Sequence, residues 1–87
     1  MADINGQPVN LTASGAISAQ PCKLIGFYVA STTSGTIVLK NGGSSGTAIT
    51  GTITPAVGWH FLPADFSTSA YATIANTLNV TFIFQPV

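Results

Sequence analysis

The side chains that could do acid–base or metal chemistry are few and widely spaced in this sequence. The chain carries two carboxylates, Asp3 and Asp65, with one histidine, His60, and one cysteine, Cys22. General acid–base catalysis needs such groups within hydrogen-bond reach of one substrate, and the two carboxylates stand near opposite ends of the chain. His60 has no obvious carboxylate partner, and one cysteine is too few for a cysteine-rich zinc site. The sequence therefore predicts a protein that is not an enzyme and holds no metal or cofactor.

Cationic side chains are equally scarce. The chain has two lysines, Lys23 and Lys40, and no arginine. Affinity for nucleic acid grows with the number of cationic contacts to phosphates, so two lysines cannot neutralise a phosphate track. The glycine-rich stretch 41–46 lacks the Gly-Lys-Ser/Thr sequence of a phosphate-binding loop. We expect no nucleic-acid partner.

The composition gives this chain few charged groups and much apolar surface for making contacts. Charged residues make up 5% of the sequence and the net charge is zero, against about 25% charged residues in an ordinary soluble domain. Hydrophobic residues make up 46%, and the mean hydropathy is +0.49. The polar surface must come from Thr, Ser, Asn and backbone groups. Shape and apolar surface are then what the protein can use.

The length of the chain limits how much of this apolar surface one copy can bury. With 87 residues there is room for one domain, and a domain of this size hides only about 60–65% of the surface that its unfolded chain exposes. Cys22 has no second cysteine to pair with, and its apolar surroundings over residues 22–27 are typical of a buried small hydrophobe. Oligomerisation remains as the support for so small a fold, so we expect contact with further copies of the chain.

The hydrophobic content does not indicate a membrane protein. The longest apolar run, Leu24 to Ala30, is far shorter than the ~20 residues that a membrane helix needs. The start Met1-Ala2-Asp3 lacks the basic and apolar regions of a secretory signal. We expect a protein made in the cytoplasm without a signal peptide and without a membrane partner.

Short runs of β-branched and aromatic residues are separated by Gly, Pro, Thr and Ser, a pattern typical of strands and turns. Turns are expected at Ser34-Gly35 and at Asn76-Thr77, where Asn76 can take a positive φ. A longer hairpin tip is expected over residues 41–46. The expected strands cover residues 9–13, 23–31, 36–40, 48–54, 59–62, 71–75 and 78–84.

Seven to eight short antiparallel strands predict an all-β fold, either an antiparallel β-sandwich or jelly roll or a small barrel. We expect this single domain over residues 9–87, preceded by a flexible N-terminal arm over residues 1–8. All five prolines are expected outside the strands. Because Lys and Glu are so rare, the sheet edges lack the charges that usually block edge pairing. The edges are therefore expected to be closed into a barrel or paired with neighbouring subunits.

Eight aromatic residues are more than so small a core needs, so we expect at least one at a subunit interface. Trp59 and Tyr71 are the first candidates, because each joins a large apolar ring to a polar group. His60 and Phe66 complete the candidate interface within the domain. In the arm, Ile4 could dock on a partner as the segment becomes ordered. The alternative is that the arm is only a frayed terminus.

Four stretches follow a layout known from one class of proteins. They read as a strand, a gap, Thr-Pro-x-x-Gly, an aromatic strand, Pro, Tyr-Ala-Thr-Ile and Val-Thr. The stretches are residues 35–42, 52–63, 66–74 and 80–84. This layout resembles that of small virion proteins of tailed bacteriophages, several of which are capsid decoration, or cement, proteins. The likeness spans roughly residues 23–85 and rests on strand and turn residues.

The resemblance implies a structural protein of the phage head. It implies a β-rich homotrimer that binds the major capsid protein on the outside of the assembled head and stabilises the shell. Other phage modules with Thr- and Gly-rich β folds leave an alternative open, a fibre, spike or tail-associated domain that recognises host-surface carbohydrate. The resemblance implies no catalytic or metal-binding residues.

Overall fold

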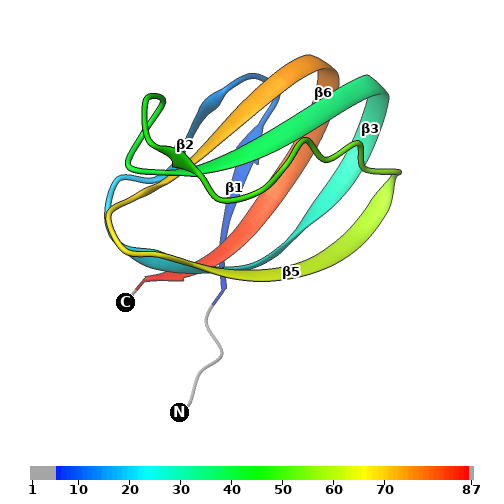
Figure 1. Ribbon diagram of the computed structural model, residues 1–87. Coiled ribbons are helices and arrows are strands. Elements are labelled where there is room, and N and C mark those ends of the chain that lie inside the picture. Colours follow the sequence, from blue (N-terminus) through cyan, green and yellow to red (C-terminus); the bar gives the residue numbers. More distant parts are fainter. Residues whose placement is uncertain (1–5, 87) are drawn as a thin grey trace.

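The computed structural model describes residues 6–86, which form an all-β structure without helix. Its strands are β1 (Gln7–Leu11), β2 (Gly15–Ser18), β3 (Cys22–Asn41), β4 (Thr47–Ala48), β5 (Gly58–Phe66) and β6 (Ala70–Pro86) (Figure 1). The expected arm over residues 1–8 falls largely outside the described part, and its last two residues begin β1.

The two longest strands, β3 and β6, run antiparallel and pair along almost their whole length, from Cys22↔Pro86 to Asn41↔Ala70. Each has different outer neighbours in its two halves. The first half of β3 pairs with β5, and the second half pairs with β4. The second half of β6 pairs with β1, and its first half pairs with β2. All six strands therefore belong to one sheet whose centre is the β3–β6 pair.

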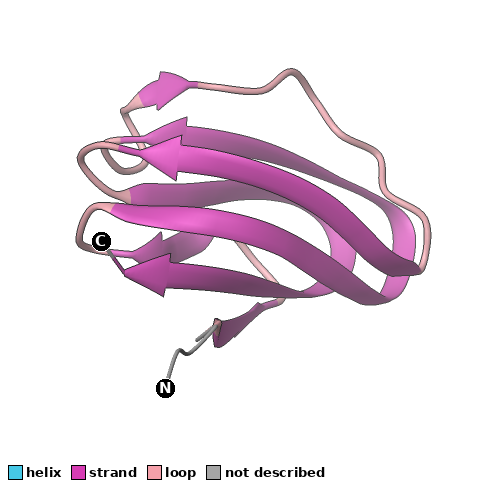
Figure 2. Cartoon of the chain, turned by 90° about the horizontal axis from the view of Figure 1, so that it is seen from below, coloured by secondary structure: helices cyan, strands magenta, loops and turns pink. Residues whose placement is uncertain are grey.

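Both long strands bend where turns were expected. Ser34 has φ 57° and Asn76 has φ 63°, so the sequence correctly predicts a positive φ at Asn76. The chain nevertheless does not reverse at either place, and the expected turns at Ser34-Gly35 and Asn76-Thr77 are wrong. The two irregularities lie beside each other in the pairing register, where Thr33 and Ser34 both face Thr77. A bulge of this kind bends a paired ladder without breaking it, and Figure 2 shows the long strands curving through the bend.

Merging of the expected strands changes their number. Residues 23–31 and 36–40 become one strand of 20 residues, and residues 71–75 and 78–84 become one of 17. The structure adds β2, which the sequence pattern did not indicate. The expected seven to eight short strands are thus six, two of them long. In the described part of the chain the sheet is open, running from β1 to β4, so the expected barrel is wrong.

Three of the five prolines lie inside strands, contrary to the expectation: Pro86 ends β6 and two others lie in edge strands, whereas Pro21 and Pro55 lie outside the strands as expected. Pro8 is in β1 and Pro63 is in β5, and each of these strands pairs with one neighbour only among the described residues. An edge strand tolerates a proline when the proline nitrogen, which carries no hydrogen, faces away from the neighbouring strand. Pro63 also lies at a register shift of the β3–β5 ladder, opposite the Leu24-to-Gly26 step. Strand β5 therefore continues through the proline to Phe66.

The glycine-rich tip over residues 41–46 is confirmed as a hairpin. It joins β3 to β4, with Lys40 paired to Ala48 and Asn41 to Thr47. Asn41 also holds the loop before β6, because its Oδ1 accepts hydrogen bonds from the backbone N–H groups of Thr68 and Ser69. The expected strand over residues 48–54 is reduced to β4 and one bridge between Ile37 and Ile53.

A single apolar core lies against both halves of the long strands. Phe27 and Val29 come from the first half of β3, and Ile37 and Leu39 come from the second half. Phe82 of β6 packs against Phe27 with ring centroids 5.7 Å apart. No polar or charged residue is buried among the described residues. The core thus accounts for the alternation of the long strands, with the polar and remaining apolar side chains facing outward.

Candidate functional site: an aromatic face on β3 and β5

Three exposed aromatic side chains lie together on the outer face of β3 and β5. Tyr28 of β3 is directly opposite Trp59 of β5, and Gly26 is directly opposite Phe61. Opposite residues of a ladder project from the same side of the sheet, so Tyr28, Trp59 and Phe61 share one face. Their exposed fractions are 48%, 49% and 71%. We call these three residues the aromatic face.

The alternation of β5 puts these rings in solvent. Along the strand Trp59, Phe61 and Pro63 are exposed, while the residues between them are partly buried and Phe66 is fully buried. Such alternation is the pattern of a strand with one face on a core and one face outward. Exposed aromatic residues on that outward face have no role in the core.

Trp59 leans over a position where the sheet has no side chain. A Cβ atom added at Gly26 would lie 2.8 Å from Trp59 Cζ2 and would also collide with the backbone oxygen of His60. The indole ring therefore covers the backbone of Gly26. Only glycine leaves room for this arrangement, since those spacings are shorter than any normal carbon contact.

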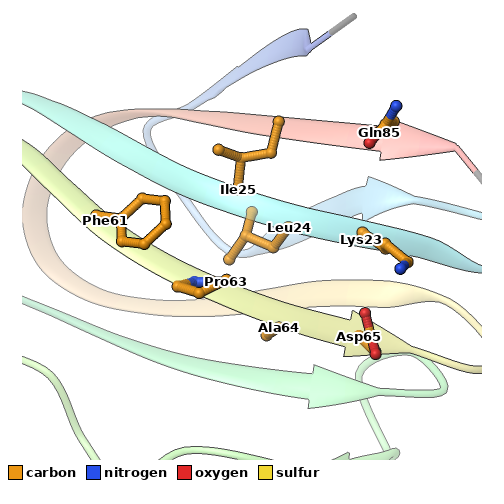
Figure 3. Close-up of a pocket in the computed structure, with 8 residues that line it drawn as sticks. All are labelled: Lys23, Leu24, Ile25, Phe61, Pro63, Ala64, Asp65 and Gln85. Atoms are coloured by element: carbon orange, nitrogen blue, oxygen red, sulfur yellow. The ribbon is translucent and has the colours of Figure 1, made fainter. Parts of the chain in front are cut away.

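A shallow groove of about 440 Å³ begins beside Phe61. Figure 3 shows its walls, with Phe61, Pro63 and Asp65 along β5 and Lys23 to Ile25 along β3. Its apolar part lies between Ile25 and Phe61. At its other end Lys23 stands opposite Asp65 in the ladder. The groove thus joins the aromatic face to one cation and one anion, with no net charge.

The residues expected at an interface lie in different places. Trp59 belongs to the aromatic face. His60 points inward and stacks on Phe27 with ring centroids 5.1 Å apart, and its Nε2 lies 2.7 Å from the Ala56 carbonyl oxygen. Phe66 has 1% of its surface exposed and belongs to the core, so its side chain cannot contact a partner while the chain is folded. Ile4 lies outside the described residues.

Tyr71 is separated from the aromatic face by the bend of the sheet. It pairs with Lys40 in the second half of β3, whereas Trp59 pairs with Tyr28 in the first half. The two residues first chosen from the sequence therefore do not form one surface. Phe61 was missed, although its position two residues after Trp59 in a strand indicates the same face. Tyr28 could be found only from the register of β3 with β5.

Groups for chemistry do not gather in the described part of the chain. Residues 6–86 contain no cluster of three His, Cys, Asp or Glu side chains that could hold a metal. Burial raises the pKa of the Cys22 thiol, and a hydrogen bond with Ser18 opposes this in part. The same residues contain no helix long and apolar enough to cross a membrane.

One motif of hydrolases does occur in the hairpin tip. Residues 42–46 read Gly-Gly-Ser-Ser-Gly, which fits the Gly-x-Ser-x-Gly pattern of a nucleophile elbow. An elbow places its serine on a sharp turn from a strand into a helix. Here the stretch connects β3 to β4, and the Ser44 carbonyl accepts a hydrogen bond of 3.1 Å from Lys40 Nζ. The pattern reflects the composition of a β-turn region.

Comparisons of the chain with protein-family models, with curated proteins and with solved structures find no match.

Proposed function

We propose that this chain is a structural, non-enzymatic protein that works by binding other protein surfaces through its outer sheet face. The observation that carries this proposal is the aromatic face, where Tyr28, Trp59 and Phe61 expose about half or more of their surface. Aromatic side chains are enriched at the energetic centres of protein interfaces. The near absence of charge favours contacts made by shape and apolar area.

We further propose the specific role of a capsid decoration protein of a tailed bacteriophage. In this role a homotrimer binds the major capsid protein on the outside of the head. The support is the resemblance of residues 23–85 to small phage virion proteins. A continuous antiparallel sheet with a single core suits such a role, because a coat subunit needs a rigid body rather than moving parts. We propose that the bend at Ser34 and Asn76 folds the sheet into two packed layers, as in a β-sandwich or jelly roll.

Stabilisation of the head would follow from mass action. A ligand that binds only the assembled shell lowers the free energy of that state by RT ln(1 + [L]/Kd) at each site. At a free concentration one hundred times Kd, this amounts to about 2.7 kcal/mol per site. Because one shell offers many such sites, the summed stabilisation free energy would be large even if each contact is weak.

Binding to emptied heads tests the proposal. Purified heads of the phage that encodes the chain, freed of DNA and of this protein, should co-sediment with the added protein. They should then resist heating or low salt better than bare heads. Phe61→Ala should weaken the binding at least tenfold. Ile49→Ala, at a residue with 40% exposure outside the aromatic face, should bind as the unchanged chain does. Failure of the unchanged protein to bind these heads would contradict the head-surface role.

A second candidate function is recognition of host-surface carbohydrate by a fibre, spike or tail-associated module. The neighbouring rings of Tyr28 and Trp59 favour it, since flat exposed rings beside a shallow groove can pack against a sugar. Adding cell-surface saccharide should then change the fluorescence of Trp59, the only tryptophan of the chain. A decoration protein should show no such change.

A further inference from the structure

We propose that the aromatic face is where copies of this chain meet one another, so that the Phe61 side chains of neighbouring subunits come together at the symmetry axis of the oligomer. This inference rests on the self-association included in the proposed function, but not on the phage head. It assigns the aromatic face to the contact between subunits, so Phe61→Ala would weaken attachment to heads by dissociating the oligomer that binds them.

Folding leaves these rings exposed although the chain is otherwise as compact as its mass requires. The accessible surface is 4580 Å², close to the roughly 4,800 Å² expected for a folded monomer of 8.8 kDa. The exposed rings are therefore a property of a well-folded subunit. They are also concentrated, because three of the five large hydrophobic residues exposed in the described part of the chain are the aromatic face, and Val57 precedes β5 closely.

The aromatic face exposes enough apolar surface for a subunit contact. A buried aromatic side chain covers roughly 150–250 Å², so the exposed fractions of the three rings leave roughly 250–400 Å² of aromatic surface in water. A patch of several hundred Å² marks an interaction site. A standard interface buries about 800 Å² on each partner. The face is large enough for the centre of such an interface, with Ile25, Pro63 and Ile83 beside it.

The charges beside the groove also favour contact between copies. Lys23 and Asp65 stand opposite each other at the end of the groove away from Phe61, so each copy presents one cation and one anion side by side. When the same patch from two copies meets, each charge can find its opposite on the neighbour. A patch with a single sign of charge would repel its own copy. The total net charge of zero adds no repulsion between whole subunits.

Strand β5 lies at an edge of the sheet. Among the described residues β5 pairs only with β3, and its nine residues carry one charged side chain, Asp65. Natural edge strands usually carry charges, above all lysine, that prevent association with another copy. Pro63 and Asp65 protect the end of this edge, but residues 58–62, which border the aromatic face, carry neither Lys nor Asp nor Glu. In this part of the edge no charge opposes association with another copy.

Cysteine cross-linking at the axis tests the inference directly. Phe61→Cys in the full chain should form a disulfide-linked dimer under mild oxidation in most of the protein. Cys22 can stay in place because it is fully buried, and the unchanged chain shows how little it contributes. Ile49→Cys, at an exposed residue outside the face, is the matched control and should stay a single chain.

Replacing the Phe61 ring by cysteine could itself weaken the contact between subunits, so a second measurement follows association directly. Sedimentation equilibrium should give an oligomer for the unchanged protein and for Ile49→Ala at micromolar concentration. Phe61→Ala should dissociate to subunits with at least a tenfold weaker association, while its strand circular dichroism stays unchanged. An unchanged chain that sediments as an 8.8 kDa monomer would overturn the inference. An oligomeric Phe61→Ala that fails to bind heads would also overturn it and give the face to the shell, with the head-surface role intact.

Discussion

The side-chain amide of Asn76 donates a hydrogen bond of 2.8 Å to the backbone carbonyl of Ser34, and both residues adopt a positive φ. One sits in β6 and the other in β3, 42 residues apart in sequence. The bond ties the two long strands together at the point where both bend. Gly35 follows Ser34, and its backbone N–H donates a hydrogen bond of 3.0 Å to Thr32 Oγ1. The bend is thus a paired feature of two strands and the element that divides the sheet into halves.

Replacement of Asn76 should destabilise the fold through this bend. Asn76→Ala loses the hydrogen bond to Ser34 and places a residue that disfavours a left-handed conformation at φ 63°. We expect a loss of about 1–2 kcal/mol in the free energy of unfolding. Asn76→Gly keeps the conformation available and should cost less than the alanine variant. Urea unfolding at equal chain concentration measures both, and equal stability of all three proteins would show that the bend does not depend on Asn76.

Gly26→Ala should dislodge Trp59 from its place over β3. The new methyl group would meet the indole at 2.8 Å and the His60 backbone oxygen, so β5 must shift away from β3. We expect a redder tryptophan emission and a loss of stability of at least about 2 kcal/mol, as for other overpacked sites. Gly51→Ala is the matched control, because an added Cβ there meets nothing within 4 Å. An unchanged emission spectrum in Gly26→Ala would contradict the described position of the ring.

The thiol of Cys22 should be inert in the folded protein. It is fully buried, and burial raises its pKa, so the neutral thiol is the form that the fold prefers. Above the ordinary thiol pKa of about 8.5 the unfolded chain releases a proton that the folded chain keeps. Stability should therefore fall as the pH rises above about 8.5. Cys22→Ala should lack this part of the pH dependence. Rapid reaction of native protein with a thiol reagent at pH 7.5 would contradict the prediction.

The N-terminal segment can be tested separately from the sheet. Because β1 begins at Gln7, removal of residues 1–5 leaves every described strand intact. We expect the melting temperature of the isolated oligomer to change little while attachment to heads weakens, as for an arm that becomes ordered on its partner. Calorimetry and co-sedimentation give the two values. Equal attachment of the shortened and complete chains would show that the segment is only a terminus.

The sequence predicts local elements better than their connections. Alternation along residues 78–84 and the glycines of residues 41–46 correctly indicate a strand and a hairpin. Ser34-Gly35 has the composition of a chain reversal, but the long ladder between β3 and β6 holds both strands in register across it. That ladder joins residues far apart in sequence, so no local pattern reveals it. Tyr28 and Trp59 meet for the same reason, and their shared face could not be read from spacing.

Phe66 illustrates a different limit. In the sequence it is an isolated aromatic residue near a loop and was expected at an interface. In the structure it lies at the end of β5, opposite Cys22, and its side chain points into the core. Side chains along a strand alternate between two faces, and the packing of the whole sheet decides which face turns toward the core. Phe61 and Phe66 lie an odd number of positions apart in one strand, so they point to opposite faces of the sheet. If Phe66 is in the core, Phe61 must face outward.

Cryo-electron microscopy of the particle that carries this chain is the decisive measurement for the proposed head-surface role. Density for the chain is expected on the outer surface of the head, in clusters around a local symmetry axis. The β5 strands of neighbouring copies should face that axis, with the Phe61 rings in contact. Density for the chain only in the tail or fibres, or on heads as isolated single subunits, would overturn the proposed role.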